Sequence, residues 1–378
     1  IQYIGLLTKF YQKTKKEYFK KKLIQTIKFI NKEFKNEENL YGSAYDADSE
    51  GVEGKYYVWS YEELKKLLEN DLKLFEKKYE ISSAGNFEGK NILVESKNEL
   101  NEGEQIKITQ IEEKLIQERS KRVRPFFDDK SQTDLNAFIL DTLIGSSIVL
   151  GDNDLKNEAM STLEIISKKL SNKIYHCYDS TEIDAFLEDY VYYAMLLVTL
   201  YEVNGDEKSL EKATNIMKEI WEIFYNKDTQ LLQKNKIKDN DLFVSPIDLN
   251  DSNIPNGNSV YLNLCNKIYT ITNDKFWFDK VEILKKSFHQ VLNSFFSQMF
   301  SFIKVLDLCE NSISFTFFGN QDSIKDIKIN LQKDYLGRAT FVYKNNNEEG
   351  SVVICKNQTC SEKLKSFDQV KNFLENNI

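Results

Sequence analysis

The chain has 378 residues and a formal net charge of −8. Hydrophobic residues make up 41% of it and aromatic residues 13%, enough to bury a substantial core in one large domain or two smaller ones. The acidic balance disfavours a nucleic-acid partner, because phosphate binding needs a basic surface. The apolar runs are short and interrupted, so the sequence predicts no membrane partner either.

The number and spacing of the cysteines and histidines limit which disulfides, redox sites and metal sites the chain can form. The five cysteines are scattered and odd in number: Cys177, Cys265, Cys309, Cys355 and Cys360. This pattern fits a reduced, cytoplasmic location better than a disulfide framework, and no pair has the two-residue spacing of a thioredoxin-type redox site. The two histidines, His176 and His289, are far apart in sequence. We therefore expect no metal site and no cofactor.

The chain repeats a helical hairpin in which two amphipathic segments flank a short polar turn. Apolar residues recur at helical spacing on both sides of turns at 13–16, 151–154, 204–206 and 273–274. Hairpins joined by longer loops are typical of a helical array. We expect the loops at 35–60, 83–105, 171–185 and 226–256 to lie on one side, where a site would be.

Further sequence signals predict helices and strands outside the helical hairpins. Ser60 followed by Glu63 predicts a capped helix through Leu68, and a further helix is expected over 106–117. Short strand-like runs occur at 56–58 and 92–94. From about residue 310 the pattern becomes β-rich, with strands predicted at 312–318, 339–343 and 352–354, a turn over 345–350 and a final helix from Ser366.

The most informative segment is an acidic loop followed by aromatic residues. Asp46, Asp48, Glu50 and Glu53 fall within eight residues, and Tyr56, Tyr57 and Trp59 follow. The start of this loop is similar to an EF-hand calcium loop, but Tyr57 stands where the bidentate Glu is required. Carboxylates beside aromatic faces suit a polyhydroxylated ligand, and the same loop could equally be held by its own hydrogen bonds.

Arginine is rare in this lysine-rich chain, and three of its four copies are clustered. Arg119, Arg122 and Arg124 fall within six residues. Such clustering indicates a need for the planar guanidinium fork, either as an internal brace to a carboxylate or as an anion site. We expect at least one of the three to pair with a carboxylate from residues 46–53 or 128–129, because an unpaired buried charge is costly.

Several motifs together resemble one family. They are Tyr41 to Trp59, Gly85-Asn86-Phe87-Glu88-Gly89-Lys90-Asn91, Arg119 to Lys130, Leu187-Glu188-Asp189-Tyr190 and Pro255-Asn256-Gly257-Asn258-Ser259. In this order they are similar to the spermatogenesis-associated, thioredoxin-domain-containing (YyaL-like) family. The chain departs from the family pattern at Leu135 and Ala137, where the family typically has Trp and Gly.

The resemblance implies a mainly α fold with a small C-terminal α/β part. It implies an incomplete (α/α)6-type toroid over residues 1–310, similar to six-hairpin glycosidases and sugar epimerases, followed by the α/β part over 311–378. It also implies a thioredoxin-like domain preceding this chain in the same gene product, as a partner. Ile1 is consistent with a chain that starts inside a longer product.

Glycoside hydrolysis needs one carboxylic acid and one carboxylate across the scissile bond. The catalytic candidates are Asp46, Asp48, Asp128 and Asp129. The ligand-binding candidates are Glu50, Glu53, Trp59, Arg122, Arg124, Asn136, Asp189 and Asn258. An epimerase would instead use histidine bases, but a structural role is favoured for His176 and His289.

The leading hypothesis is a carbohydrate-related protein that binds or modifies a small sugar-like ligand at the toroid mouth, with an activity of glycosidase or epimerase type. This hypothesis depends largely on architecture. The alternative is a non-enzymatic interaction or redox-support module serving a thioredoxin-like domain.

Overall fold

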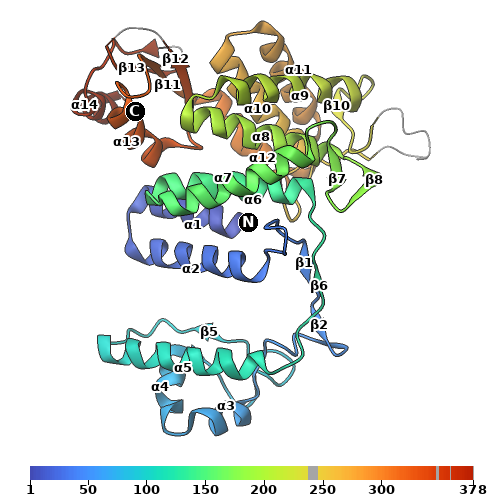
Figure 1. Cartoon of the computed structure of the whole chain (residues 1–378), viewed down its shortest axis with the longest axis vertical. Helices are drawn as coiled ribbons and strands as arrows, with labels where there is room; N and C mark the ends of the chain where they lie inside the picture. The colour runs from blue at the N-terminus through green and yellow to red at the C-terminus, as the bar shows by residue number, and fades with distance from the viewer. Residues whose placement is uncertain (237–245, 346–348, 358, 378) are drawn as a thin grey trace. The chain divides into compact units, whose positions relative to one another are not determined.

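The computed structural model describes residues 1–236, 246–345, 349–357 and 359–377, without the side chains of 180–182 and 293–295. The chain forms two compact units (Figure 1). The first unit comprises Ile1–Gly42 and Lys130–Ile378, and the second comprises Ser43–Asp129. The sequence predicts one toroid domain over residues 1–310, whereas in the structure residues 43–129 form a compact unit of their own.

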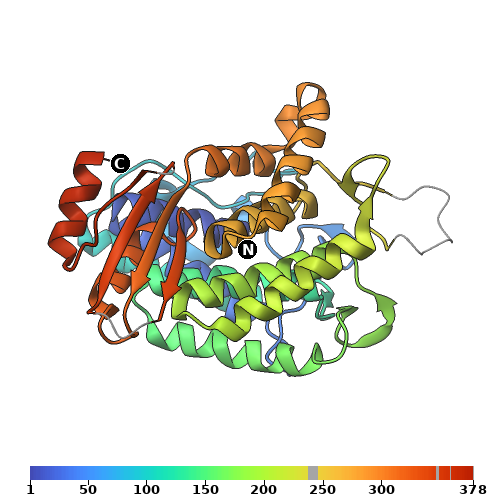
Figure 2. The same cartoon turned by 90° about the horizontal axis from the view of Figure 1, so that it is seen from above.

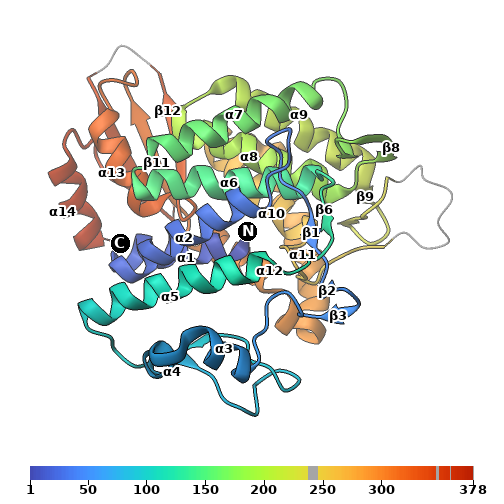
Figure 3. The ribbon, with the colours of Figure 1, turned by 60° about the horizontal axis from the view of Figure 1, so that its bottom comes forward.

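Antiparallel helical hairpins build most of the first unit, as predicted. The pairs are α1 (Gln2–Thr14) with α2 (Glu17–Glu33), α6 (Thr133–Leu150) with α7 (Asn153–Lys169), α8 (Leu187–Asn204) with α9 (Glu207–Phe224), and α10 (Gly257–Thr272) with α11 (Lys275–Phe295). The short 3-10 helix η2 (Phe296–Gln298) leads into α12 (Phe300–Glu310). Figure 3 shows α6 and α7 running side by side.

The polar turns that marked the hairpins have a common physical basis. The residue that ends the first helix adopts the left-handed conformation at Gly151, Gly205 and Asn273, which Gly and Asn adopt at low cost. The second helix then begins with an aspartate cap at Asp152, Asp206 or Asp274.

The first helix of each hairpin belongs to an inner layer. In chain order α1 packs on α6, α6 on α8, α8 on α10 and α10 on α12. The helices α2, α7, α9 and α11 each pack on the outside of their own partner. This is the predicted (α/α) toroid arrangement, with four hairpins among the described residues of the first unit.

The inner helices begin at the same end of this layer. The Asp134 N–H at the start of α6 donates to Asp189 at the start of α8. The Ser301 N–H at the start of α12 donates to Asp251, just before α10. Because the positive ends of the helix dipoles gather here, this end suits carboxylates.

Helix α6 is, in the described chain, the one helix long and apolar enough to cross a membrane by length and composition alone. The expectation that no apolar run reaches this length is therefore wrong. More than half of α6 is buried in the protein, where it packs against α1, α7 and α8. The core position accounts for its apolar composition.

The C-terminal residues form the predicted α/β part. Its sheet has the order β12 (Thr340–Lys344), β11 (Ile313–Phe318), β13 (Ser351–Lys356) and β14 (Thr359–Cys360). β11 and β12 are parallel, and the other pairs are antiparallel. Figure 2 shows the strands of the sheet side by side. Helices α13 (Lys325–Tyr335) and α14 (Phe367–Asn377) complete this part.

The C-terminal part packs on the carboxyl end of α8. The Gln332 amide donates to the carbonyl oxygens of Glu202 and Val203, and the Tyr343 hydroxyl donates to that of Glu202 at 2.6 Å. These side chains satisfy carbonyls that a helix end leaves unpaired. The predicted boundary at 310/311 falls between α12 and β11, within the first unit. Of the predicted turn at 345–350, residues 346–348 lie outside the described chain.

Cys355 and Cys360 form a disulfide, contrary to the expectation of reduced cysteines. They are direct partners in the register of the antiparallel pair β13–β14. Five residues of sequence separation suffice for a hairpin to bring two side chains face to face. Cys177, Cys265 and Cys309 are free.

The second unit is a small helical body. Helices α3 (Tyr61–Leu68), α4 (Leu72–Lys78) and α5 (Glu102–Ser120), with the 3-10 helix η1 (Glu69–Asp71), enclose a core that includes Trp59 and Phe75. Short antiparallel pairs connect its loops: β1 (Ala44–Tyr45) with β6 (Phe127–Asp128), β2 (Asp48–Ser49) with β3 (Val52–Glu53), and β4 (Tyr79–Glu80) with β5 (Val94–Glu95). The predicted Ser60 cap is confirmed, since its side chain accepts from Glu63.

The close approach of α8 and α10 gives a stability test. A Cβ added at Gly257 would lie 2.9 Å from Leu187 side-chain atoms and 3.0 Å from Glu188, whereas one at Gly145, within α6, would meet nothing within 4 Å. We predict that Gly257→Ala lowers the free energy of unfolding by about 1–2 kcal/mol. Gly145→Ala should raise it by up to about 1 kcal/mol through helix propensity. Urea denaturation of both variants would measure this, and equal effects would contradict the proposed close packing.

Candidate functional site

The buried carboxylate of Asp189 organises a polar cluster at the start of the inner helices. Asp189 is fully buried in the first turn of α8. It accepts hydrogen bonds from the backbone N–H of Phe186 at 2.8 Å and from that of Asp134 at 3.1 Å. The Nδ1 atom of His176 lies 3.0 Å from its Oδ2. One carboxylate therefore joins α6, α8 and the β7–β8 hairpin.

His176 is presented by β7 (Tyr175–Cys177), which pairs with β8 (Ser180–Asp184). Its side chain keeps 18% of its surface exposed, so the imidazole is accessible while Asp189 is not. The hydrogen bond to Asp189 raises the pKa of His176, and partial burial opposes this shift. The Nε2 atom lies 3.3 Å from the Gln132 amide nitrogen, and the ring packs edge-on against Phe186. With Nδ1 engaged by Asp189, Nε2 is the atom available for proton transfer.

Asp134 is the second carboxyl group of the cluster. Burial, followed by the nearby charge of Asp189, raises the pKa of Asp134 to about 6. Ligand atoms of Asp134, His176 and Asp189 all lie within 4.8 Å of one another. A carboxyl group that titrates near neutrality beside a histidine is suited to acid–base chemistry.

Glu188 adds a third acidic side chain at this end of the helices. Its Oε2 atom is buried and has no hydrogen-bond partner among the described residues. Burial raises the pKa of Glu188. The positive charge of Lys234 opposes this shift by lowering the pKa of Glu188. Lys234 itself pairs with Asp248 at 3.2 Å. The site therefore holds more acidic than basic groups.

Asp134, His176 and Asp189 have the residue types of a divalent-cation site. However, Asp189 already accepts from two backbone N–H groups and faces Nδ1 of His176. Its lone pairs are engaged, which leaves His176 Nε2 and Asp134 as the available ligand atoms. Two ligands fit a metal centre less well than the same geometry fits a histidine oriented by a carboxylate.

Two of the predicted ligand-binding residues, Asn136 and Asn258, instead clamp backbone. The Asn136 side chain accepts from the Tyr41 N–H and donates to the Tyr41 and Gln132 carbonyls. Asn258 accepts from the Leu232 N–H and donates to its carbonyl. Both asparagines are fully buried, and these bonds use their polar atoms. Asp189 is thus the predicted residue that the structure places in the polar cluster.

The predicted acidic loop lies in the second unit. Asp46, Asp48, Glu50 and Glu53 are all exposed there. Asp46 accepts from the Asp48 N–H, and Glu50 pairs with Lys55 at 2.8 Å. The β1–β6 pairing, in which Ala44 faces Asp128, brings this loop next to the second acidic segment with Asp129. The two segments are neighbours within this unit, but they do not belong to the unit that holds Asp189.

The arginine cluster contacts aromatic rings in the second unit. Arg122 lies 4.0 Å from the ring centroid of Trp59, which is itself buried in the core, and pairs with Glu63 at 2.7 Å. The partner of Arg122 is thus Glu63 on α3, and the prediction that at least one of the three arginines pairs with residues 46–53 or 128–129 stays a prediction. Arg124 lies over Tyr45. Trp59 and Arg122 stabilise this unit through packing and backbone hydrogen bonds to residues 55, 56 and 58.

Sequence reasoning missed His176, Asp134 and Gln132 as site residues. His176 lies in the predicted loop 171–185, which indeed leads to this end of the inner helices, but a lone histidine in a loop carries little signal. Asp134 stands at the start of α6, and Glu188-Asp189 at the start of α8. A search for acidic residues in the first turns of successive hairpins would have found both.

Comparisons with known proteins add a likeness in architecture. No family model and no curated protein match the chain. Among solved structures it is similar to a family 76 α-mannanase of Bacteroides thetaiotaomicron, at 13% identity and a TM-score of 0.44, over 88% of this chain and 72% of that one. It is also similar to a D-mannose isomerase, at 11% identity and a TM-score of 0.40, over 75% and 72%. Identities this low assign no chemistry to the chain.

The backbone clamp can be tested by mutation. We predict that Asn136→Ala lowers the free energy of unfolding by about 2–4 kcal/mol, since the buried N–H and C=O groups of Tyr41 lose their partner. Asn157→Ala on the exposed side of α7 serves as control and should change it by less than about 0.5 kcal/mol. A stable Asn136→Ala protein in urea titrations would contradict a structural role.

The cluster should make stability depend on pH. The raised pKa of Asp134 favours its protonated form in the fold, so stability is lost as the pH rises from about 4 through about 6. The raised pKa of His176 acts in the same sense: its contribution is complete below pH ~6.5 and is lost as the pH rises through the folded value. We predict that Asp134→Asn removes part of this loss, on the order of 1–3 kcal/mol at pH 8 relative to pH 5.

Chemical denaturation of wild type and Asp134→Asn at both pH values would measure this difference. In parallel, NMR titration of the His176 ring should show a lower pKa in Asp134→Asn, because the negative charge of Asp134 helps to raise it. Identical pH profiles for the two proteins would contradict the assigned coupling.

Proposed function

We propose that the cluster of Asp134, His176 and Asp189 is an acid–base site that transfers a proton on a small sugar-like ligand. The observation that carries the proposal is the accessible imidazole of His176, held by the buried Asp189 beside a carboxyl group of pKa about 6. A carboxyl group of raised pKa beside a histidine that a carboxylate orients is suited to proton transfer next to a carbonyl.

In the proposed reaction, one of the two groups, Asp134 and His176, removes a proton from the ligand while the other donates one. The Asp134 carboxylate takes the proton from the carbon beside the carbonyl of an open-chain sugar, while the His176 imidazolium donates its Nε2 proton to the carbonyl oxygen. The resulting enediol is then protonated at carbon by the Asp134 carboxylic acid, and the neutral imidazole takes a proton back from the enediol hydroxyl. Asp189 stabilises the imidazolium and fixes its orientation, as a positioning residue.

A polyhydroxylated ligand suits the composition of the site. Carboxylates accept hydrogen bonds from hydroxyl groups, and the Gln132 amide both donates and accepts. Phe186 lines the His176 ring and offers an apolar edge. The family resemblance seen in the sequence points to the same ligand class and stays part of this proposal. Hydrolysis by Asp134 and Glu188 is the alternative chemistry at the same place, since Glu188 also has a raised pKa.

Solvent deuterium incorporation tests the proposed reaction. The purified chain is incubated in D2O with a panel of aldoses, ketoses and reducing disaccharides, and ¹H NMR follows exchange at the carbon beside the carbonyl. We expect exchange with at least one sugar, reduced about 10²–10⁴-fold in His176→Gln and Asp134→Asn. His289→Gln, which changes the exposed histidine of α11, should keep the wild-type rate.

Release of new reducing ends without deuterium exchange would favour hydrolysis by the same carboxyl groups. If no sugar exchanges, hydrolyses or binds in saturation-transfer NMR, the proposal fails. The non-enzymatic interaction or redox-support role would then be the better hypothesis. Wild-type exchange in folded His176→Gln would also overturn the assigned acid.

A further inference from the structure

The turn of the first helical hairpin differs from the turns of the other three. In the first hairpin, Lys15 ends α1 in the left-handed conformation at φ 54°, and Lys16 stands at the N-cap of α2 without a side-chain cap bond. In the other hairpins, the same two positions hold a left-handed Gly or Asn and a capping aspartate: Gly151-Asp152, Gly205-Asp206 and Asn273-Asp274.

Both lysines stand against the stability of this turn. A left-handed backbone costs a lysine more than a glycine, because the Cβ atom crowds the carbonyl oxygen. The Lys16 side chain cannot accept a hydrogen bond from the free N–H groups at the start of α2, and its charge lies at the positive end of the helix dipole. The fold therefore gives no reason for a lysine at position 16.

The two lysines belong to the basic tip, defined as residues 13–22. The basic tip holds six lysines and one acidic residue, whereas the whole chain has a net charge of −8. Lys15 pairs with Asp334 at 2.6 Å, but an exposed ion pair contributes little to stability. Three further lysines of the tip are exposed and have no carboxylate partner within the described residues: Lys13, Lys16 and Lys21.

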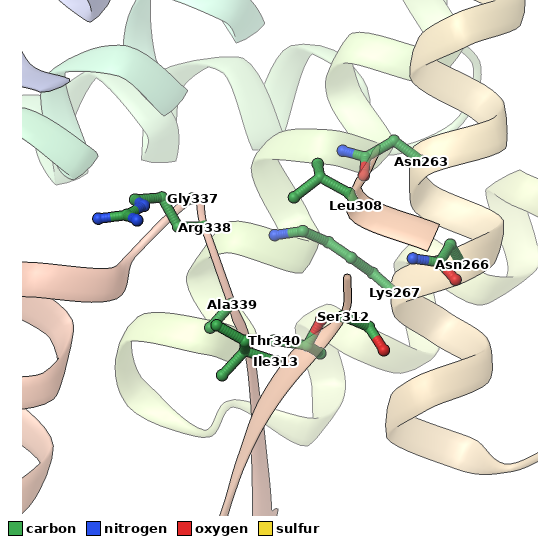
Figure 4. Close-up of a pocket in the computed structure, with 10 residues that line it drawn as sticks. All are labelled: Asn263, Asn266, Lys267, Leu308, Ser312, Ile313, Gly337, Arg338, Ala339 and Thr340. Carbon is green, nitrogen blue, oxygen red and sulfur yellow. The ribbon is translucent and has the colours of Figure 1, made fainter. Parts of the chain in front are cut away.

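Lys267, inside the first unit, shows how the fold can neutralise a lysine. Figure 4 shows its side chain extending from α10 between Asn263 and the Gly337–Arg338 turn. Its ammonium group pairs with the buried carboxylate of Glu202 at 2.5 Å. The exposed lysines of the basic tip are not neutralised in this way, so their charge faces solvent.

Apolar side chains lie beside these lysines. Phe10 of α1 stacks on Phe19 of α2 with ring centroids 5.0 Å apart, and Tyr18 meets Phe19 edge-on. Phe10 is 44% exposed and Tyr18 is 60% exposed. The outward face of α1 continues from Phe10 with Leu6 and Tyr3, at helical spacing and both at least half exposed. Cationic and apolar groups are therefore presented to solvent together.

A partner for this surface must be anionic and must accept apolar side chains. An anionic lipid membrane meets both conditions, because lysines contact the headgroups while aromatic and leucine side chains enter the interface. Nucleic acid fits less well, since the contact between Phe10 and Phe19 covers one face of each ring on which bases would stack. A surface contact needs no spanning helix, so the expectation drawn from the short apolar runs does not bear on it.

We propose that the basic tip and the adjoining face of α1 dock on the surface of a membrane that contains anionic lipid. Lys13, Lys16 and Lys21 lie against the charged headgroups, and Phe10 and Tyr18 enter the boundary between headgroups and acyl chains. The acidic remainder of the chain weakens this attraction little, because screening limits the reach of a charge to about 10 Å at 0.1 M salt. This inference is independent of the reaction proposed for the acid–base site.

Co-sedimentation of the full chain with two kinds of vesicle tests the proposal: phosphatidylcholine alone, and phosphatidylcholine with about 30 mol% phosphatidylserine. At low salt we expect binding to the anionic vesicles at least about tenfold stronger than to the neutral ones. Raising the salt to about 0.5 M should remove most of this difference. Equal binding to both vesicles would overturn the proposal.

Two further probes separate the lipid from other anionic partners. They are a single-stranded oligonucleotide and a polyglutamate peptide, each titrated under the same conditions. Binding of either probe without binding of the anionic vesicles would overturn the assignment to lipid, in favour of nucleic acid or of an acidic protein segment.

Charge-removing variants locate the contact. The double variant Lys13→Gln, Lys21→Gln should weaken binding to anionic vesicles about 25-fold, because each lysine near such a surface strengthens binding about fivefold. The matched control, Lys218→Gln with Lys286→Gln, removes two exposed charges from α9 and α11 and should change binding less than about twofold. Equal losses in the two double variants would overturn the proposal, since net charge alone would explain them.

Lys16→Asp gives α2 the aspartate cap of the other hairpins and separates binding from stability. It should raise the melting temperature, because the new carboxylate accepts from free N–H groups and suits the helix dipole. It should also weaken binding to anionic vesicles about 25-fold, since two units of charge change. A lower melting temperature would overturn the argument that Lys16 stands against the stability of the fold, and wild-type binding by the folded variant would overturn the docking itself.

Discussion

The first unit depends on how it satisfies the polar groups where its inner helices begin. Asp189 is the clearest case, because one buried carboxylate accepts from the start of its own helix, from the start of α6 and from the histidine of the β7–β8 hairpin. A buried carboxylate without such donors would be very costly. The need to satisfy Asp189 therefore fixes the relative positions of two helices and one hairpin, and the same need makes His176 a strongly held, accessible imidazole.

The first turns of the neighbouring hairpins show what is special about α8. In the first turns of α6 and α10, Asn136 and Asn258 clamp the backbone of Tyr41 and Leu232. The surrounding loops match as well, since the N–H of the next residue donates to the carbonyl of Phe34 in one case and of Phe224 in the other. In the first turn of α8 an ionisable carboxylate replaces the amide. Asp189 accepts from two backbone N–H groups at helix starts instead of clamping one loop residue, and it faces the ring of His176.

Charge is distributed along the inner helices in a way that follows their dipoles. Acidic side chains gather at the shared starting end, where partial positive charge favours them. The lysines Lys9, Lys267 and Lys304 lie further along the helices, around Asp141 and Glu202. Burial raises the pKa of acidic groups in the first region and lowers that of Lys304 in the second. Burial thereby moves the pKa of Asp134 and that of Lys304 toward neutral pH.

The sequence by itself determined the helical hairpins and the C-terminal sheet. Their signals are local: a 3.6-residue apolar period, left-handed Gly151 or Asn273 at a helix end, and an aspartate cap on the next helix. It could not determine which polar residues meet, because Asp134, His176 and Asp189 are brought together by packing between segments more than ten residues apart. The acidic loop had the strongest local pattern, yet it folds into the compact unit of residues 43–129. Likewise Asn136 and Asn258 have motifs suggestive of a site, and only tertiary contacts reveal that buried backbone takes up their hydrogen bonds.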